Sequence, residues 1–354
     1  MQSLYQQICE YENLYNAFHR ARHGKRHQET VAQFERGLEI ELFRLQNELL
    51  TKQYRPGQYR SFYLTDSKRR LISAAPFRDR VVHHALVGPT EPLFERRFIF
   101  DSYASRKNKG THRALDRCTR FLRSGGYVLQ GDIRQFFPSI DHAILQGELS
   151  RLITDPHTLW LADRILETGV GVLDEEYAMV YFSGDNLFAQ SRPRGLPIGN
   201  LTSQFWANVY LNPFDQFVKR QLKCRRYIRY VDDFLLFADD KQTLHHWKNA
   251  IIEFLAGLRL TIHAVAPVRP VTEGLPFLGF SLYPNQRRLK PARGYEFQRR
   301  LKVNLRAYTA GEIDFEQLTA SVKGWAAHAA HGDTYGLRRA VLSQTRLLPV
   351  IMPT

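Results

Sequence analysis

Cysteine is scarce in this sequence, and the few thiols present are far apart. The three cysteines, Cys9, Cys118 and Cys224, show no paired spacing. This absence argues against a disulfide framework and against a cysteine-based zinc site, because both need paired or closely spaced thiols. We expect all three to be buried structural residues.

Long apolar runs are also missing. No stretch reaches the roughly 18 consecutive apolar residues that a membrane-spanning helix requires. No charged-then-apolar leader opens the sequence either. We therefore expect a cytoplasmic protein with no membrane partner.

Acidic residues are in deficit, since 35 Asp and Glu stand against 50 Lys and Arg, which gives a formal net charge of +15. The excess is concentrated: residues 287–306 contain eight Lys or Arg and the single acid Glu296. A solvated helix face usually mixes its charges more evenly. The distribution favours a partner with many phosphates, for which counterion release supplies most of the non-specific affinity, over a generically basic protein.

The most informative motif is a pair of adjacent aspartates inside an apolar run. Asp232 and Asp233 follow Tyr-Val at residues 230–231, and short apolar segments of strand character flank them. Two carboxylates this close repel each other and resist burial unless cations or donors compensate them. An isolated Asp-Asp pair is ordinarily a solvated turn, whereas a pair within an apolar hairpin indicates a divalent metal site.

A third carboxylate stands in a similar setting. Residues 127–130 are typical of a strand, Asp132 follows them, and a helix can begin with Ser139 as its N-cap. If this strand lies beside the hairpin, Asp132 can bind the same metal ions as Asp232.

A loop punctuated by glycine and proline, residues 194–200, lies between the acidic segments and leads into a helix with an apolar face. Gly199 has no Cβ, so we expect the backbone to approach a ligand closely there.

These segments, in this order and spacing, resemble the palm motifs of reverse transcriptases. The resemblance is carried by Asp132 with its aromatic pair Phe136 and Phe137, and by residues 198–204, 230–233 and 277–280. It extends over nearly the whole chain. It implies an RNA-directed DNA polymerase with an α+β right-hand fold of fingers, palm and helical thumb.

The segment 198–204 is similar to one subgroup in particular. Most reverse transcriptases related to group II introns carry Gln-Gly before the spacer and Ser-Pro after it, whereas Ile198-Gly199 and Ser203-Gln204 resemble the enzymes of diversity-generating retroelements. The resemblance implies error-prone cDNA synthesis for mutagenic retrohoming, with a basic oligomeric accessory protein as a partner. No zinc-knuckle or endonuclease segment follows the predicted thumb, so we do not expect a self-mobile intron protein.

Segments rich in glycine, proline and polar residues interrupt the apolar patterns and divide the chain into four predicted regions. Residues 1–53 are expected to form an N-terminal helical extension and residues 54–125 the fingers, with a hairpin that turns at Asp66 and Ser67. Residues 126–284 are expected to form the palm, with an insertion at about 142–194, and residues 285–354 a basic helical thumb. Asp314 and Gln317 predict a capping box at the start of a thumb helix.

The resemblance also implies a two-metal site. Asp132, Asp232 and Asp233 would be the catalytic and metal-binding carboxylates, and the backbone carbonyl of Ile133 a further ligand. The expected cofactor is a pair of Mg²⁺ ions, with Mn²⁺ as a substitute. One ion would lower the pKa of the primer 3′-hydroxyl and the other would hold the triphosphate.

Phe137 matches the aromatic gate that fills the space of a ribose 2′-hydroxyl, which predicts a DNA product; plain packing is the alternative. Ile198 cannot make the hydrogen bond of the amide side chain found there in related polymerases, which predicts low fidelity. The full set of residues predicted to bind the incoming nucleotide is Lys68, Arg70, Phe137, Ile198, Gly199, Ser203 and Gln204. For Lys68 and Arg70 a solvated basic turn is the alternative.

The nucleic-acid contacts are predicted from the basic residues and from a primer-grip hairpin at residues 277–280. The predicted set is Lys109, Phe277, Leu278, Gly279, Arg287, Arg288, Arg299 and Arg300. Polymerases often place a Lys after the palm hairpin to protonate pyrophosphate, but residues 258–267 contain His263 and no Lys. His263 is therefore a candidate general acid, and a structural histidine is the alternative.

Three functions fit the sequence. The first is a reverse transcriptase that uses a template RNA, a DNA or RNA primer and dNTPs in a diversity-generating retroelement. The second is the same chemistry in antiviral defence or another bacterial retroelement. The third is an inactive RNA-binding scaffold, which is disfavoured because a scaffold needs no clustered carboxylates beside nucleic acid.

Overall fold

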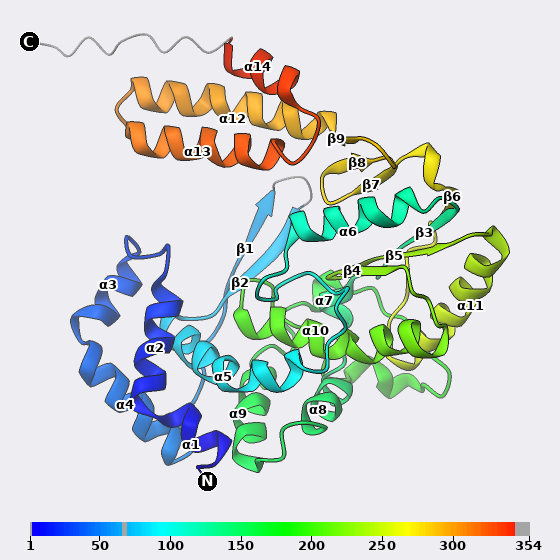
Figure 1. Cartoon of the computed structure of the whole chain (residues 1–354). Coiled ribbons are helices and arrows are strands. Elements are labelled where there is room, and N and C mark those ends of the chain that lie inside the picture. Colours follow the sequence, from blue (N-terminus) through cyan, green and yellow to red (C-terminus); the bar gives the residue numbers. More distant parts are fainter. Residues whose placement is uncertain (1, 66–68, 344–354) are drawn as a thin grey trace, which may run out of the picture.

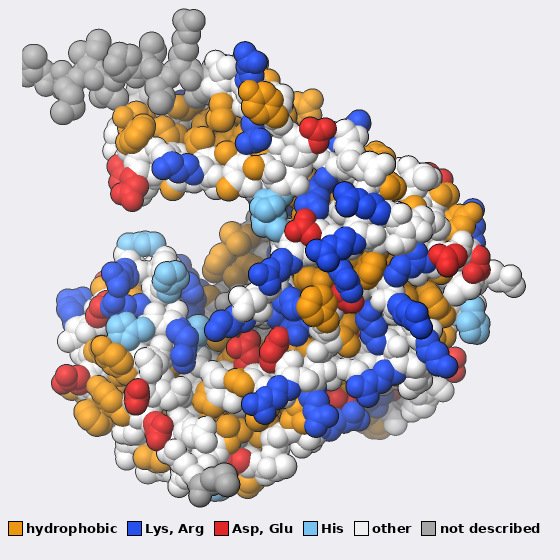
Figure 2. Space-filling view, viewed as in Figure 1, with side chains coloured by type: hydrophobic (Ala, Val, Ile, Leu, Met, Phe, Trp, Pro, Cys, Tyr) orange, Lys and Arg blue, Asp and Glu red, His pale blue; other side chains and the backbone are white. Residues whose placement is uncertain are grey.

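The computed structural model describes residues 2–65 and 69–343. Within these residues helices predominate, and the strands form three small antiparallel sheets. N-terminal helices and a C-terminal helical arm lie on either side of an open cleft, with the main sheet at its base (Figures 1 and 2). The described residues include no helix that is both long and apolar enough to cross a membrane.

The N-terminal part is helical, as predicted. It consists of α1 (Leu4–Cys9), α2 (Tyr11–Arg22), α3 (Glu29–Arg36) and α4 (Leu38–Leu50). Apolar residues three or four positions apart, such as those of α4 at Leu42, Leu45 and Leu49, are fully buried. Helices α1, α2 and α3 pack against α5 (Phe77–Glu95), and α4 packs against α1, α2 and α3.

A two-stranded hairpin extends from this part toward the C-terminal arm (Figure 1). Strands β1 (Arg60–Thr65) and β2 (Arg69–Ala74) pair antiparallel, with Thr65 opposite Arg69. The predicted hairpin is confirmed, and its predicted turn at Asp66 and Ser67 lies outside the described residues.

The main sheet has four antiparallel strands in the order β4-β5-β3-β6. Their bounds are Tyr127–Asp132 for β3, Tyr227–Tyr230 for β4, Asp233–Ala238 for β5 and Val268–Pro270 for β6. Alternate residues of β5 enter two different cores: Phe234 and Leu236 pack in one, Leu235 and Phe237 in the other. The sheet is therefore covered on both faces, which explains why residues 234–238 of β5 form a continuous apolar run.

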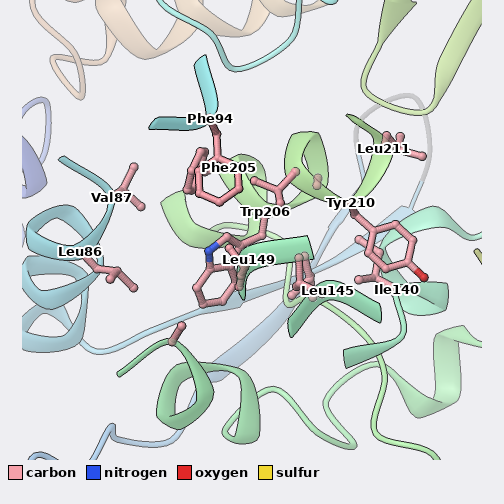
Figure 3. Packing of buried hydrophobic residues seen from close by; sticks show 14 of the residues in the cluster. Leu86, Val87, Phe94, Ile140, Leu145, Leu149, Phe205, Trp206, Tyr210 and Leu211 are labelled. Carbon is pink, nitrogen blue, oxygen red and sulfur yellow. The ribbon is translucent and has the colours of Figure 1, made fainter. Parts of the chain in front are cut away.

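Helices cover both faces of this sheet. Helix α6 (Thr111–Arg123) contributes to one core, while α8 (His142–Ser150), α10 (Leu201–Gln216) and α11 (Lys241–Gly257) contribute to the other. Figure 3 shows residues of α5, α8 and α10 meeting in this second core. Helix α9 (Pro156–Glu167) packs on α8. The three cysteines are buried in these two cores, which confirms the prediction of structural thiols.

One predicted helix start is wrong. Ser139 ends the short helix α7 (Phe136–Ser139) and does not cap a new helix. Helix α8 instead begins after Asp141, whose carboxylate accepts a hydrogen bond from the Ile144 amide at 3.1 Å. The reason is tertiary: the amide of Gly195 donates to the carbonyl of Ile140 at 2.8 Å, which holds the chain extended after Ser139.

The C-terminal arm comprises a small sheet and three helices. The strands are β7 (Leu275–Phe277), β8 (Phe280–Leu282) and β9 (Arg287–Leu289), and the helices are α12 (Pro291–Thr309), α13 (Phe315–Ala329) and α14 (Tyr335–Ser343). The rings of Phe297 and Trp325 stack at 4.1 Å between α12 and α13. The predicted capping box is confirmed, because the Asp314 carboxylate accepts from the Gln317 amide at 2.7 Å and the Gln317 side chain accepts from the Asp314 amide at 3.1 Å.

Candidate active site

The strand register brings the predicted carboxylates to one edge of the main sheet. Asp132 ends β3 and stands directly opposite Asp233, which begins β5. Facing residues of antiparallel strands have Cα atoms about 4.5–5.5 Å apart. Asp232 lies in the two-residue turn between β4 and β5, and its carbonyl accepts a hydrogen bond from the Ile133 amide at 3.2 Å. Residues a hundred positions apart in sequence therefore meet at this edge.

A cavity of about 840 Å³ opens over these carboxylates. It is lined from the main sheet, the hairpin, the loop before α10 and the C-terminal arm. The predicted site residues that line it are Arg70, Asp132, Ile133, Phe137, Ile198, Gly199, Ser203, Gln204, Asp232, Asp233, His263, Phe277, Leu278 and Gly279. Lys109, Arg287, Arg288, Arg299 and Arg300 do not line it, and Lys68 lies outside the described residues.

The donors at this edge suit a hard cation. Within residues 2–65 and 69–343, no three His, Cys, Asp or Glu side chains are arranged as a complete metal-ligand set. Mg²⁺ does not require one, because it keeps several waters and is bound through one or two carboxylates together with substrate phosphates. Asp132 and Asp233, in facing register at the wall of an open cavity, fit that mode.

His263 lies beside Asp132. Its Nε2 is 3.3 Å from Oδ2 of Asp132, and its backbone amide donates to the Asp132 carbonyl at 2.9 Å. Half of the His263 side chain is exposed (53%). The ring is thus accessible from the cavity and within reach of a carboxylate, which is compatible with both a proton-transfer role and an orienting role.

The two phenylalanines after Asp132 have different environments. Phe136 is 2% exposed and belongs to the core, whereas Phe137 is half-buried at the edge of that core. Both residues border the cavity, and their ring centroids are 5.4 Å apart. Only the partly exposed ring of Phe137 is free to meet a substrate.

The loop before α10 is held against the hairpin. Gly199 has a φ of +114°, and a Cβ there would lie 3.0 Å from Cγ2 of Ile72. Glycine therefore permits a close approach to β2 at this position. The close approach to a ligand that we also expected there stays a prediction, and Gly199 lines the cavity. The Ser203 hydroxyl also has an internal role, since it donates to the Pro197 carbonyl at 2.7 Å.

Asn200 was not identified from the sequence as a residue that supports the site. It is 2% exposed, its amide nitrogen donates to the Ser73 carbonyl at 2.9 Å, and its oxygen accepts from the Ala75 amide at 3.1 Å. This side chain joins the hairpin to the floor of the cavity. An Asn just before a helix is typical of an N-cap, so no sequence signal pointed to the contact of Asn200 with residues 73 and 75.

Several cations at the cavity were also missed. Arg69, Lys290 and Arg293 line it together with the predicted Arg70. Arg69 packs over the Tyr63 ring at 3.7 Å, a contact between β2 and β1. The cavity therefore has carboxylates on its floor and cations on two walls, an arrangement suited to metal ions and phosphate groups.

A second cavity of about 620 Å³ continues this surface into the C-terminal arm. It shares Leu278, Gly279 and Arg293 with the first cavity, and Arg299 and Arg300 line it. Leu278 and Gly279 have φ values of 47° and 88°, so the β7–β8 hairpin makes a tight turn of the kind that needs positive φ at both central residues. This turn lies between the two cavities and lines both of them.

Two residues predicted to bind nucleic acid, Lys109 and Arg287, also have partners within the protein. The ammonium of Lys109 donates to the Phe100 carbonyl at 2.6 Å and lies 3.5 Å from the Phe100 ring centroid; burial lowers its pKa. The Arg287 guanidinium donates to Asp116 at 2.8 Å and to the His331 carbonyl at 3.0 Å. Arg288, Arg299 and Arg300 are exposed and remain the stronger candidates for nucleic-acid contacts.

The insertion, whose role the sequence did not indicate, supports the active-site elements. The Glu176 carboxylate accepts from the Tyr63 hydroxyl at 2.9 Å, and its carbonyl accepts from Nε2 of Gln135 at 2.7 Å. Gln135 has a φ of 48° and immediately precedes Phe136. Glu176 thus joins the β1–β2 hairpin to the segment that presents Phe137.

Residues 60–281 match the family model of reverse transcriptases (RNA-dependent DNA polymerases). This match extends over more than half of the chain and includes all three carboxylates. The chain belongs to the reverse transcriptase family. The predicted α+β right-hand fold and the predicted class of enzyme, an RNA-directed DNA polymerase, are confirmed at this level.

Two similar proteins extend this picture. The chain is 25% identical to protein YkfC of Escherichia coli (strain K12) over 290 residues, which cover 69% of this chain and 72% of YkfC. It is 27% identical to the group II intron-encoded protein LtrA of Lactococcus lactis subsp. cremoris over 175 residues, which cover 49% of this chain and only 27% of LtrA. A protein encoded by a group II intron is therefore among the homologues of this reverse transcriptase.

Among solved structures, apo telomerase from Candida tropicalis, truncated from the C-terminal domain, aligns with a TM-score of 0.47 and 11% identity. The alignment covers 69% of this chain and 59% of the telomerase chain. The chain therefore spans only part of the length of LtrA and of this telomerase.

Proposed function

We propose that this reverse transcriptase acts in the cytoplasm and copies a template RNA into error-prone cDNA for a diversity-generating retroelement. A DNA or RNA primer, dNTPs and a basic oligomeric accessory protein would be its partners. The observation that carries the proposal is Ile198, an apolar residue that lines the cavity where related polymerases have an amide side chain.

The carboxylates give the site its chemistry. Asp132 and Asp232 would hold two Mg²⁺ ions, or Mn²⁺ in their place, with Asp233 and the Ile133 carbonyl as supporting donors. When bound, these ions supply charge stabilisation and a more acidic primer 3′-hydroxyl.

The remaining residues bind and orient the substrates. Arg70, which lines the cavity, would pair with triphosphate oxygens, and the Phe137 ring would exclude a 2′-hydroxyl. His263 would supply the proton for the departing pyrophosphate. The β7–β8 turn would support the primer end, and Arg299 and Arg300 would contact the backbone of the duplex.

Ile198 would lower fidelity because its side chain cannot form a hydrogen bond. A side chain that hydrogen-bonds near the nascent pair penalises a mispair that leaves it without a partner, and an aliphatic chain imposes no such penalty. The Ile198 carbonyl accepts from the Ser73 amide at 2.8 Å, so a substitution of its side chain leaves the loop anchored.

The test is primer extension on RNA with Mg²⁺ and dNTPs, followed by sequencing of the products, with and without the accessory protein. We expect errors concentrated opposite template adenines, fewer errors in Ile198→Gln, and an unchanged spectrum in the control Ile198→Leu. Accurate or template-free products would favour antiviral defence over the retroelement. No extension with the native RNA and the accessory protein present would leave an RNA-binding scaffold.

A further inference from the structure

A buried ion pair lies beneath the turn that carries Asp232. Arg229 in β4 is 1% exposed and Asp215 in α10 is 0% exposed. Nε of Arg229 donates to Oδ1 of Asp215 at 2.8 Å, and Nη2 donates to Oδ2 at 2.7 Å. The Tyr227 hydroxyl donates to the same carboxylate at 2.8 Å. This bidentate pair fixes the plane of the guanidinium.

The remaining nitrogen of Arg229 is directed to the turn itself. Nη1 donates to the Val231 carbonyl at 2.9 Å and to the Asn208 side-chain oxygen at 3.2 Å. Asn208 in turn donates to the Ala104 carbonyl at 2.9 Å. One guanidinium therefore connects α10 and the loop before α6 to the peptide that precedes Asp232.

The turn needs such support because its backbone is strained. Val231 has a φ of 58°, a left-handed conformation that a β-branched residue rarely adopts. A conformation of this kind persists only when its surroundings over-determine it. The hydrogen bond from Arg229 to the Val231 carbonyl is one such constraint, and the bond from the Ile133 amide to the Asp232 carbonyl is another.

Arg229 also interacts with the site electrostatically. Burial disfavours its charge, but Asp215, Tyr227 and Asp232 together outweigh that effect and raise its pKa. The guanidinium thus remains charged beneath the turn that carries Asp232.

We propose that Arg229 is a positioning residue for nucleotidyl transfer. It fixes the Val231 carbonyl and thereby keeps the Asp232 carboxylate in the cavity that Asp132 also lines. This inference rests on the proposed polymerase function. Arg229 is not proposed to touch a substrate or a metal ion, since it acts through the turn.

The test separates positioning from stability. Replacing both members of a buried ion pair, together with a residue that hydrogen-bonds to them, by apolar residues of similar size is often neutral or stabilising. The triple variant Tyr227→Phe/Asp215→Leu/Arg229→Met should therefore fold, yet it lacks the donor to Val231. The matched control, Tyr227→Phe, retains the Arg229–Asp215 ion pair and the bond from Arg229 to the turn.

Three quantities are measured: the urea unfolding midpoint, amide hydrogen exchange of residues 227–237 without metal, and kcat and KM for primer extension. In the triple variant we expect a near wild-type midpoint, faster exchange confined to the turn, and an unchanged KM for primer–template. We expect kcat to fall by about 100-fold, because a misplacement of about 1 Å has that effect. The control should resemble the wild type in exchange and in kcat.

Wild-type exchange and kcat in the triple variant would overturn the proposal and leave the pair a purely structural feature. If the triple variant does not fold, Arg229→Lys is compared with the same control, and equal exchange and equal kcat in both would overturn it. The exchange measurement needs no catalysis, so a wild-type protein that fails to extend a primer contradicts the proposed function without deciding this test.

Discussion

At the scale of single residues, Phe137 is the side chain with the sharpest predicted effect on substrate choice. Its ring is half-buried at the cavity wall, whereas Phe136 is in the core. In Phe137→Ala we expect the preference for dNTPs over rNTPs, measured as a ratio of kcat/KM values, to fall by about 10- to 100-fold, since the pocket no longer rejects the 2′-hydroxyl.

The neighbouring ring supplies the control for that experiment. Phe136→Leu should lower the stability of the protein by about 1 kcal/mol, as a modest large-to-small change in a core does, and leave the ratio unchanged. A similar loss of discrimination in both variants would show that Phe137 acts through packing alone.

Sequence reasoning found the residues that local chemistry makes conspicuous. Asp132, Asp232 and Asp233 were identifiable because carboxylates within apolar strands need compensation. Asn200 and Arg229 were not, since an Asn before a helix and an Arg in a strand are ordinary until the fold shows what they contact. The contact of Gly199 with Ile72 was not foreseen either, because the sequence does not show which segment packs on that loop.

At the scale of elements, α5 contains a built-in sensitivity to acid. Burial, then His84 and Arg80, lower the pKa of His83 to about 3, while burial, then Arg20 and Lys25, lower that of His84 to about 4. Both folded-state values lie below the unfolded value of 6.5, so the unfolded state binds more protons as the pH falls. Stability is therefore lost below about pH 6.5.

His83→Leu tests this directly. Because each group contributes up to about 1.4 kcal/mol per pH unit, the wild type should lose clearly more unfolding free energy than the variant between roughly pH 6.5 and 4.5. Urea denaturation at the two pH values measures the difference. Parallel losses in the two proteins would contradict the assignment to His83.

Helices and strands were predicted well where the spacing of apolar residues determines them. They were predicted poorly where tertiary contacts determine them. The helices of residues 4–50 and the strands around Asp132 and Asp232 follow from apolar spacing. The start of α8 does not, because the pairing of Ile140 with Gly195 overrides a good N-cap at Ser139. The insertion has little apolar periodicity, so its contacts from Glu176 to Tyr63 and Gln135 could not be foreseen.

At the scale of the whole molecule, the charge distribution determines how the protein binds nucleic acid. The net charge of +15 and the cations of the second cavity predict a steep fall in affinity with salt. Arg299→Gln/Arg300→Gln should reduce the slope of log K against log salt for a primer–template by about 1 to 2, since each phosphate contact contributes about 0.9.

A control with the same change in net charge is available far from the cavity. Arg44→Gln/Arg151→Gln removes two exposed cations that pair with Glu41 and Glu148 on helix surfaces. The slope should remain that of the wild type. Equal changes in both variants would mean that total charge, and not the cavity, governs binding.

The central claim is that Asp132, Asp232 and Asp233 form the catalytic centre of an RNA-templated DNA polymerase. The most direct measurement is single-turnover addition of one deoxynucleotide to a DNA primer on an RNA template with Mg²⁺, in wild type, Asp232→Asn and the exposed-carboxylate control Asp239→Asn. We predict addition by the wild type and by the control. In Asp232→Asn the rate of addition should fall by at least about 1,000-fold while primer–template affinity is retained. This fall corresponds to a loss of about 4 kcal/mol of transition-state stabilisation. Addition at the wild-type rate by Asp232→Asn would contradict the account.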